Sequence, residues 1–194
     1  MSSLNPALRP ARVVADLLPR RAAVDVALVA VAAALTGLSA QVSIPWWPVP
    51  LTLQTFAVLL AGSSLGAARA SAAMVLYAGA GVAGVPWFAK HTSGWGGPTF
   101  GYVLGFVAAA LVVGLLSERL STRKPVQVLA AFALGSVVVY AFGASWLKQD
   151  LGVSWSQAAD LGIWKFLPGD AVKALAAAGL LPATWALVDR VRRG

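Results

Sequence analysis

Charged side chains are scarce in this chain. Asp, Glu, Lys and Arg make up 11% of its 194 residues, whereas 59% are hydrophobic and the mean hydropathy is +0.76. Soluble domains carry about a quarter charged residues, so this composition excludes an ordinary soluble protein and predicts an integral membrane protein.

Several chemistry-bearing residues and motifs are also missing. The chain has no cysteine and one histidine, His91, which excludes disulfides, thiol chemistry and Cys- or His-rich metal sites. It contains no G-x-x-x-x-G-K-[ST] loop for ATP, no H-E-x-x-H and no G-x-S-x-G. We therefore expect no metal, no cofactor, no ATP hydrolysis by this chain and no enzymatic activity.

What the chain does have is long apolar segments. A helix rises about 1.5 Å per residue, so about 20 residues cross a hydrocarbon core of about 30 Å. We predict an all-α fold with one six-helix membrane domain over residues 23–190, preceded by a cytoplasmic tail over residues 1–22. The six predicted membrane-spanning helices cover residues 23–44, 51–67, 70–88, 100–117, 126–146 and 167–188.

The net charge of +8 is distributed in a way that predicts orientation rather than nucleic-acid binding. With both termini in the cytoplasm, three cations lie on the outer side, namely Lys90, Lys148 and Lys165. Cytoplasmic segments of membrane proteins are enriched in Lys and Arg. Eleven Lys and Arg residues lie on the inner side, namely Arg9, Arg12, Arg20, Arg21, Arg69, Arg119, Arg123, Lys124, Arg190, Arg192 and Arg193.

The predicted outer loops are long and aromatic, whereas the inner loops are short and basic. Residues 43–55 read SIPWWPVPLTLQT, which predicts an ordered, non-helical loop or a re-entrant segment. Residues 148–166 could include a short amphipathic helix at the membrane surface. This asymmetry favours an outward-facing site for a small molecule, although Trp also anchors membrane interfaces.

Asp170 and Lys173 are the two clear ionisable residues within the apolar segments. Charges inside a membrane cost about 2.5–3.5 kcal/mol each on insertion scales, so they pair with one another or line a site. The i, i+3 spacing places both on one face of a helix. They predict a binding site near the outer mouth, and the alternative is a purely structural ion pair.

Four further residues are candidates for the same site. Gln54 begins the second predicted helix and can both donate and accept, although a helix–helix hydrogen bond would also explain it. Tyr77 precedes a glycine-rich run, and Lys90 and Tyr102 lie near the predicted outer mouth. Either of the last two could instead be an interfacial residue.

Four motifs resemble the BioY family of biotin-uptake proteins, which are substrate-binding S components of energy-coupling factor (ECF) transporters. The resemblance covers residues 45–175, and the P-V-P-x-T-x-Q-T and P-G-D-x-x-K blocks are its most specific parts. The motifs read PVPLTLQTFAVLLAGSSLG (48–66), YAGAGVAGVPWF (77–88), GPTFGYVLGF (97–106) and LPGDAVKAL (167–175).

The resemblance implies a high-affinity biotin-binding membrane subunit of the plasma membrane that mediates biotin uptake. Asp170 and Lys173 match the family motif best as biotin-contacting residues, and Gln54 and Tyr77 also match motif positions. Trp46 and Trp47 are expected at the gate of the pocket from their position in the first outer loop.

The resemblance also implies partners besides biotin and the lipid bilayer. These are the transmembrane coupling protein EcfT and two ATPase subunits, which alone would use ATP, and a homo-oligomer working without them stays open. Small residues on the first helix resemble the surface that meets EcfT, namely Ala23, Ala27, Ala30 and Ala34. The alternative function is a self-sufficient, proton-coupled secondary transporter of a small vitamin-like carboxylate.

Overall fold

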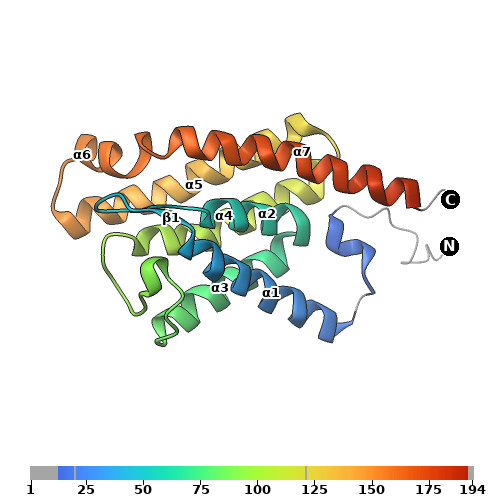
Figure 1. Cartoon of the computed structure of the whole chain (residues 1–194), viewed down its shortest axis with the longest axis horizontal. Helices are drawn as coiled ribbons and strands as arrows, with labels where there is room; N and C mark the ends of the chain where they lie inside the picture. Colours follow the sequence, from blue (N-terminus) through green and yellow to red (C-terminus); the bar gives the residue numbers. More distant parts are fainter. Residues whose placement is uncertain (1–12, 20, 121, 192–194) are drawn as a thin grey trace, which may run out of the picture.

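The structure, a computed structural model, describes residues 13–19, 21–120 and 122–191. Six longer helices and one small hairpin make up most of it (Figure 1). The helices are α1 (Ala22–Gln41), α2 (Gln54–Leu65), α3 (Ala67–Val82), α4 (Phe100–Leu120), α5 (Pro125–Leu151) and α7 (Leu167–Val191). The shorter elements are the 3-10 helices η2 (Val14–Leu17) and η3 (Ala89–His91), strands β1 (Ser43–Ile44) and β2 (Leu51–Thr52), helix α6 (Trp155–Ala159) and the π-helix η4 (Asp160–Trp164).

Helix α4 lies at the centre of the bundle, between α2, α3 and α5. In its most apolar stretch 61% of the residues are buried, whereas the corresponding value is 22% for both α1 and α7. Close packing depends on small residues: a Cβ on Gly114 of α4 would lie 2.4 Å from the Cα atom of Ala67. The outer faces of α1 and α7 are therefore available to lipid or to a partner.

Helices α2 and α3 form a tight antiparallel pair that turns at Gly66. The φ angle of Gly66 is +81°, a left-handed value that residues with a Cβ rarely adopt. A carboxylate oxygen of Glu118 accepts a hydrogen bond of 2.7 Å from the Ala67 N–H and so caps the start of α3. Because α3 runs back along α2, its Tyr77 returns to the level of Gln54 at the start of α2.

Four helices, α1, α4, α5 and α7, are long and apolar enough to cross a membrane. Helices α2 and α3 are shorter than the segments predicted for them, with 12 and 16 residues. The first residues of segment 51–67 instead belong to the antiparallel β1–β2 hairpin, which confirms a non-helical first loop. The third segment stops at Val82 because the next residues turn, with a φ angle of +109° at Gly84.

The starts of α1 and α3 and the end of α7 gather at one end of the bundle, here called the terminal end (Figure 1). Arg69 Nε donates to Asp25 Oδ1 at 2.7 Å, which joins α3 to α1, and Arg123 pairs with Asp189 at 2.7 Å. Within the predicted tail 1–22, residues 1–12 and 20 lie outside the described residues. The described part includes η2, whose Ala15 is buried.

Candidate functional site

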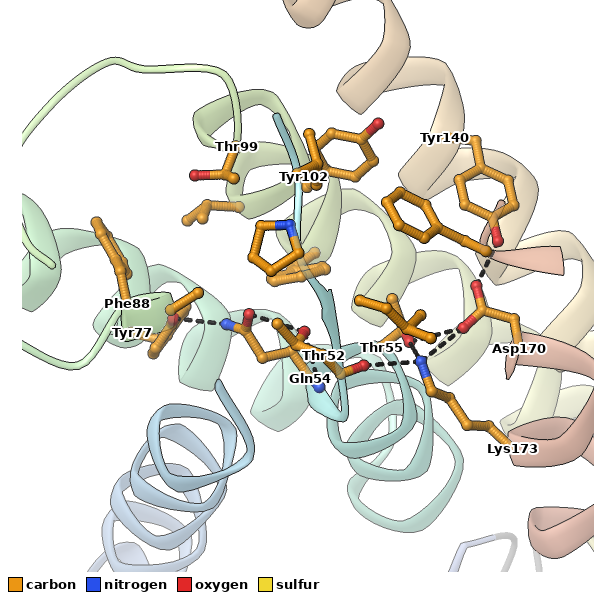
Figure 2. Close-up of a pocket in the computed structure, with 17 residues that line it drawn as sticks. Thr52, Gln54, Thr55, Tyr77, Phe88, Thr99, Tyr102, Tyr140, Asp170 and Lys173 are labelled. Atoms are coloured by element: carbon orange, nitrogen blue, oxygen red, sulfur yellow. Dashed lines mark hydrogen bonds and ion pairs between the residues drawn. The ribbon is translucent and has the colours of Figure 1, made fainter. Parts of the chain in front are cut away.

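A cavity opens at the opposite end of the bundle, here called the pocket end. The space between its walls, with the open mouth included, is about 550 Å³. Its walls come from the first loop, the α3–α4 loop and helices α2–α5 and α7 (Figure 2). The lining residues are Val49, Pro50, Leu51, Thr52, Gln54, Thr55, Tyr77, Phe88, Ala89, Thr99, Tyr102, Val103, Phe106, Tyr140, Phe166, Asp170 and Lys173.

Asp170 and Lys173 lie together in this wall, as the i, i+3 spacing predicts. Lys173 Nζ is 2.7 Å from Asp170 Oδ1, and the Lys173 and Asp170 side chains are 12% and 9% exposed. Lys173 also donates to the Thr52 carbonyl at 2.8 Å and to the Thr55 hydroxyl at 2.7 Å. The three donors of the ammonium group therefore all have acceptors, which is how a buried cation is stabilised.

The carboxylate of Asp170 is held from two further directions. The Thr55 hydroxyl donates to Oδ1 at 3.0 Å, and the Tyr140 hydroxyl donates to Oδ2. These contacts join α2, α5 and α7 around one charge pair (Figure 2). We call Thr55, Tyr140, Asp170 and Lys173 the ion-pair side of the cavity.

The other polar group of the cavity centres on Gln54. Its Nε2 donates to the Tyr77 hydroxyl at 2.6 Å, and its Oε1 accepts from the Thr52 hydroxyl at 3.1 Å. Tyr77 lies between two aromatic rings of the α3–α4 loop, with ring centroids 5.2 Å from Trp87 and 5.3 Å from Phe88. We call Gln54, Tyr77, Trp87 and Phe88 the amide side of the cavity.

Tyr102 lines the cavity with its ring, while its hydroxyl is used elsewhere. The hydroxyl donates to the Gly162 carbonyl in η4 at 2.8 Å, and the ring meets Phe166 edge-on at 6.2 Å. The short helix expected within residues 148–166 is present as α6 and continues into η4. Tyr102 therefore contributes a flat apolar surface to the cavity and ties this short segment to α4.

The remaining predicted residues lie outside the lining. Lys90 is exposed, next to the lining residue Ala89, and its role in binding stays a prediction. Trp46 stacks on the lining residue Phe166 at 6.2 Å, whereas Trp47 is 74% exposed. The gate therefore also stays a prediction, with Trp46 better placed for it.

The predicted partner surface lies on a different part of the molecule. All four of its alanines are exposed on α1, as are Val26, Val31, Leu35 and Leu38. Nothing in the described residues covers this stripe, and contact with a partner stays a prediction. The four alanines are Ala23, Ala27, Ala30 and Ala34.

Sequence reasoning did not identify seven polar or aromatic residues that line the cavity, namely Thr52, Thr55, Phe88, Thr99, Phe106, Tyr140 and Phe166. Thr52 and Thr55 stand within the P-V-P-x-T-x-Q-T block, so the block itself was a usable signal. Tyr140 is the one tyrosine of the long apolar helix α5, and a polar group in such a segment is a usable signal. Phe166 had no comparable signal, because an aromatic residue at a helix end is common in membrane proteins.

The arrangement suits recognition of a small polar molecule. A carboxylate, an ammonium group and an amide supply acceptors and donors within one cavity, and aromatic rings supply apolar walls. Among residues 13–19, 21–120 and 122–191, no cluster of three or more His, Asp or Glu side chains is placed to hold a metal ion.

Comparison with known proteins supports this interpretation. A sequence model of the BioY family matches residues 11–190. A relative named "Probable biotin transporter BioY" from Pyrococcus horikoshii is 38% identical over 156 residues, covering 79% of this chain and 91% of the relative. The biotin transporter BioY of Rhizobium etli is 36% identical over 167 residues, covering 79% and 89%.

A solved structure has the same fold. It is the 2.1 Å crystal structure of the S-component for biotin from an ECF-type ABC transporter, with a TM-score of 0.73 at 20% identity. The match covers 88% of this chain and 91% of the solved one. Because the family match spans nearly all the sequence and the relatives are covered over most of their own length, the chain belongs to the BioY family.

Proposed function

We propose that this protein is a high-affinity biotin-binding membrane subunit that mediates biotin uptake. The observation that carries the proposal is the buried Asp170–Lys173 pair, which lines the cavity of a member of the BioY family. Relatives named as biotin transporters support biotin as the ligand.

The chemistry of biotin matches the cavity. Its ureido ring offers two N–H donors and a carbonyl acceptor, its valerate arm ends in a carboxylate, and its thioether ring is apolar. The cavity offers the Asp170 carboxylate, the Lys173 ammonium group and the Gln54 amide, together with aromatic walls. We propose these three residues as the polar ligand contacts and Tyr77 and Tyr102 as parts of the wall, with Lys90 at the mouth.

We propose that all six longer helices cross the plasma membrane and that both termini are cytoplasmic. Helices α2 and α3 are about 18 Å and 24 Å long at 1.5 Å per residue, so each covers only part of the membrane thickness. The hairpin and the α3–α4 loop complete that thickness at the pocket end. Basic residues at the terminal end, among them Arg69, Arg123 and Arg190, support the orientation.

Uptake requires an energy source that this sequence lacks. We propose that the protein is the S component of an ECF transporter and meets EcfT through the exposed face of α1, with two ATPase subunits supplying the energy. The fold shared with a biotin S-component supports this assignment. The poorly buried α1 supplies an accessible surface for such a partner.

The first experiment is calorimetric titration of biotin into the purified protein, in parallel with Asp170→Ala and Lys173→Ala. Loss of one charge-assisted hydrogen bond costs about 1.5–3 kcal/mol, so each substitution should weaken binding by at least about 10-fold. Tight binding that both substitutions weaken is the expected result. A wild-type protein that does not bind biotin would contradict the proposal.

A transport assay separates ATP-driven uptake from the proton-coupled alternative. Proteoliposomes with the protein alone should not accumulate biotin on a proton gradient, and adding the coupling protein and ATPases with ATP should produce uptake. Accumulation by the protein alone that collapses with the proton gradient would favour the secondary transporter.

A further inference from the structure

Gln41, the last residue of α1, joins that helix to the α3–α4 loop with both ends of its side-chain amide. We infer that Gln41 is a positioning residue for the cavity wall: it holds residues 87–91 in place and thereby sets how long a bound ligand stays. This inference rests on the proposed biotin-binding function and adds to it a residue outside the cavity.

The contacts of Gln41 are directed at the loop backbone. Its Nε2 lies 3.0 Å from the Phe88 carbonyl oxygen and 3.3 Å from that of Trp87, and its Oε1 accepts from the His91 N–H at 3.1 Å. The same nitrogen lies 3.2 Å from the Gly37 carbonyl oxygen in its own helix. The two N–H protons of the Gln41 amide are shared among these three carbonyl acceptors. Both protons and the amide oxygen of Gln41 therefore have hydrogen-bond partners.

The loop held by Gln41 has an unfavourable backbone conformation. Lys90 and His91 have φ angles of 60° and 56°, the left-handed region that side chains with a Cβ disfavour. A tight turn of this kind persists only where surrounding contacts hold it. Gln41 supplies one such contact at His91, and Phe88 N–H to Thr92 O at 3.0 Å supplies another.

This loop forms a wall of the cavity. Phe88 is buried, lines the cavity and packs edge-on against Tyr77, and the adjacent Ala89 also lines it. Gln41 binds the carbonyl of Phe88 itself, so its hydrogen bond acts on the residue whose ring forms the wall. Release of the bond would free the wall to move away from a ligand.

The position of Gln41 at the end of α1 also couples this helix to the α3–α4 loop. Only 22% of the most apolar stretch of α1, the helix that carries Gln41, is buried. Its Gly37 packs closely on Trp87, since a Cβ on Gly37 would lie only 3.1 Å from the Trp87 Cβ. A displacement of the end of α1 would therefore be transmitted to the loop through a hydrogen-bonded and packed contact. Movements of α1 and of the cavity wall are coupled at this point.

The test uses Gln41→Met, which keeps the size of the side chain and removes all its hydrogen bonds, and Gln41→Glu, which retains an acceptor for His91 N–H. Gln149→Met is the matched control, since Gln149 is an exposed residue near the end of α5. Two quantities are measured on the purified full chain: amide hydrogen exchange of residues 87–92 without ligand, and the dissociation rate of biotin.

We expect Gln41→Met to speed exchange in this loop and to raise the biotin dissociation rate about tenfold, the equivalent of one to two net hydrogen bonds. Gln41→Glu should be at least as disruptive as Gln41→Met, because a carboxylate oxygen would face the carbonyl oxygens of Phe88 and Trp87 with no proton to donate, and Gln149→Met should match the wild type. Faster exchange confined to residues 87–92, with exchange in the other helices unchanged, is a readout that general destabilisation would not produce.

Unchanged exchange in Gln41→Met would overturn the inference, and so would faster exchange with an unchanged dissociation rate. If Gln41→Met does not fold, the same two measurements on Gln41→Glu decide the matter. Failure of the wild type to bind biotin would overturn the proposed function and the ligand part of this inference, while the exchange data would still show whether Gln41 holds the loop.

Discussion

The two polar sides of the cavity are built differently. On the ion-pair side, all four side chains project from the helices α2, α5 and α7. On the amide side, Trp87 and Phe88 belong to the α3–α4 loop. Helices give precise placement of charges, whereas a loop can open and close, so the first side suits recognition and the second suits admission of the ligand.

The two sides also differ in what a single substitution leaves behind. Asp170 and Lys173 are nearly inaccessible, and removal of either leaves an uncompensated buried charge. On the amide side the hydrogen-bonding groups are neutral, so their loss leaves only an unsatisfied polar group. Substitutions on the ion-pair side should therefore have larger effects than substitutions on the amide side.

The largest effect is expected for Lys173→Met. It leaves the Asp170 carboxylate without its cation, and breaking a buried pair in this way costs about 3–5 kcal/mol. We expect a loss of biotin affinity of more than about 100-fold by calorimetry and a lower melting temperature in detergent.

The double variant Asp170→Asn with Lys173→Met is the control for this prediction. It removes both charges, so the melting temperature should recover while biotin binding stays lost. If the double variant binds biotin like the wild type, the ion pair has only a structural role and does not contribute to biotin binding.

Tyr140→Phe tests the ion-pair side more gently. It removes the hydroxyl that donates to Asp170 Oδ2, and a hydrogen bond to a charged group is worth about 1.5–3 kcal/mol. Biotin affinity should fall by about 10- to 150-fold with the ring packing intact. Tyr102→Phe, which loses a bond to the neutral Gly162 carbonyl, should have the smaller effect, and the reverse order would contradict this assignment.

Gly81→Ala tests the amide side through packing. A Cβ at position 81 would lie 2.1 Å from Cζ of Phe88, so the Phe88 ring must move from its place in the wall. Overpacking of this kind costs about 1–3 kcal/mol, which should appear as faster biotin dissociation. Gly79→Ala, in the same helix with no heavy atom within 4 Å, is the matched control and should bind like the wild type.

The smallest effect is expected at the mouth. Trp46→Ala removes a ring stacked on Phe166, and such aromatic pairs contribute about 0.5–1.5 kcal/mol beyond their buried area. Biotin should then associate and dissociate several-fold faster in stopped-flow measurements. Trp47→Ala, at a residue 74% exposed, should change neither rate, and equal effects at both positions would contradict a gate formed by Trp46.

Sequence patterns predicted the parts of this molecule that depend on local spacing. The i, i+3 positions of Asp170 and Lys173 are enough to place both on one helical face, and the structure brings them to 2.7 Å. Gln54 and Tyr77 were identified as polar groups in apolar segments, but their contact joins residues 23 apart and depends on the reversal at Gly66.

Other features depend on tertiary packing that no local pattern reports. Hydropathy stays high through residues 83–88, although the chain has already turned, because hydropathy does not record backbone direction. Gln41 and Tyr140 acquire their roles from partners across the bundle, 47 and 30 residues away. The lengths of α2 and α3 and the hydrogen bonds of Gln41 to the α3–α4 loop could therefore not be predicted from the sequence.

The mutual neutralisation of Asp170 and Lys173 bears on how membrane voltage acts on transport. These two are the charged side chains among the residues that line the cavity, and their charges sum to zero. A bound ligand with an ionised carboxylate adds one net negative charge. Carrying that charge across the whole membrane field changes the free energy by about 2.3 kcal/mol per 100 mV. An inside-negative potential should therefore oppose inward passage of the loaded site and leave the return of the unloaded one unaffected.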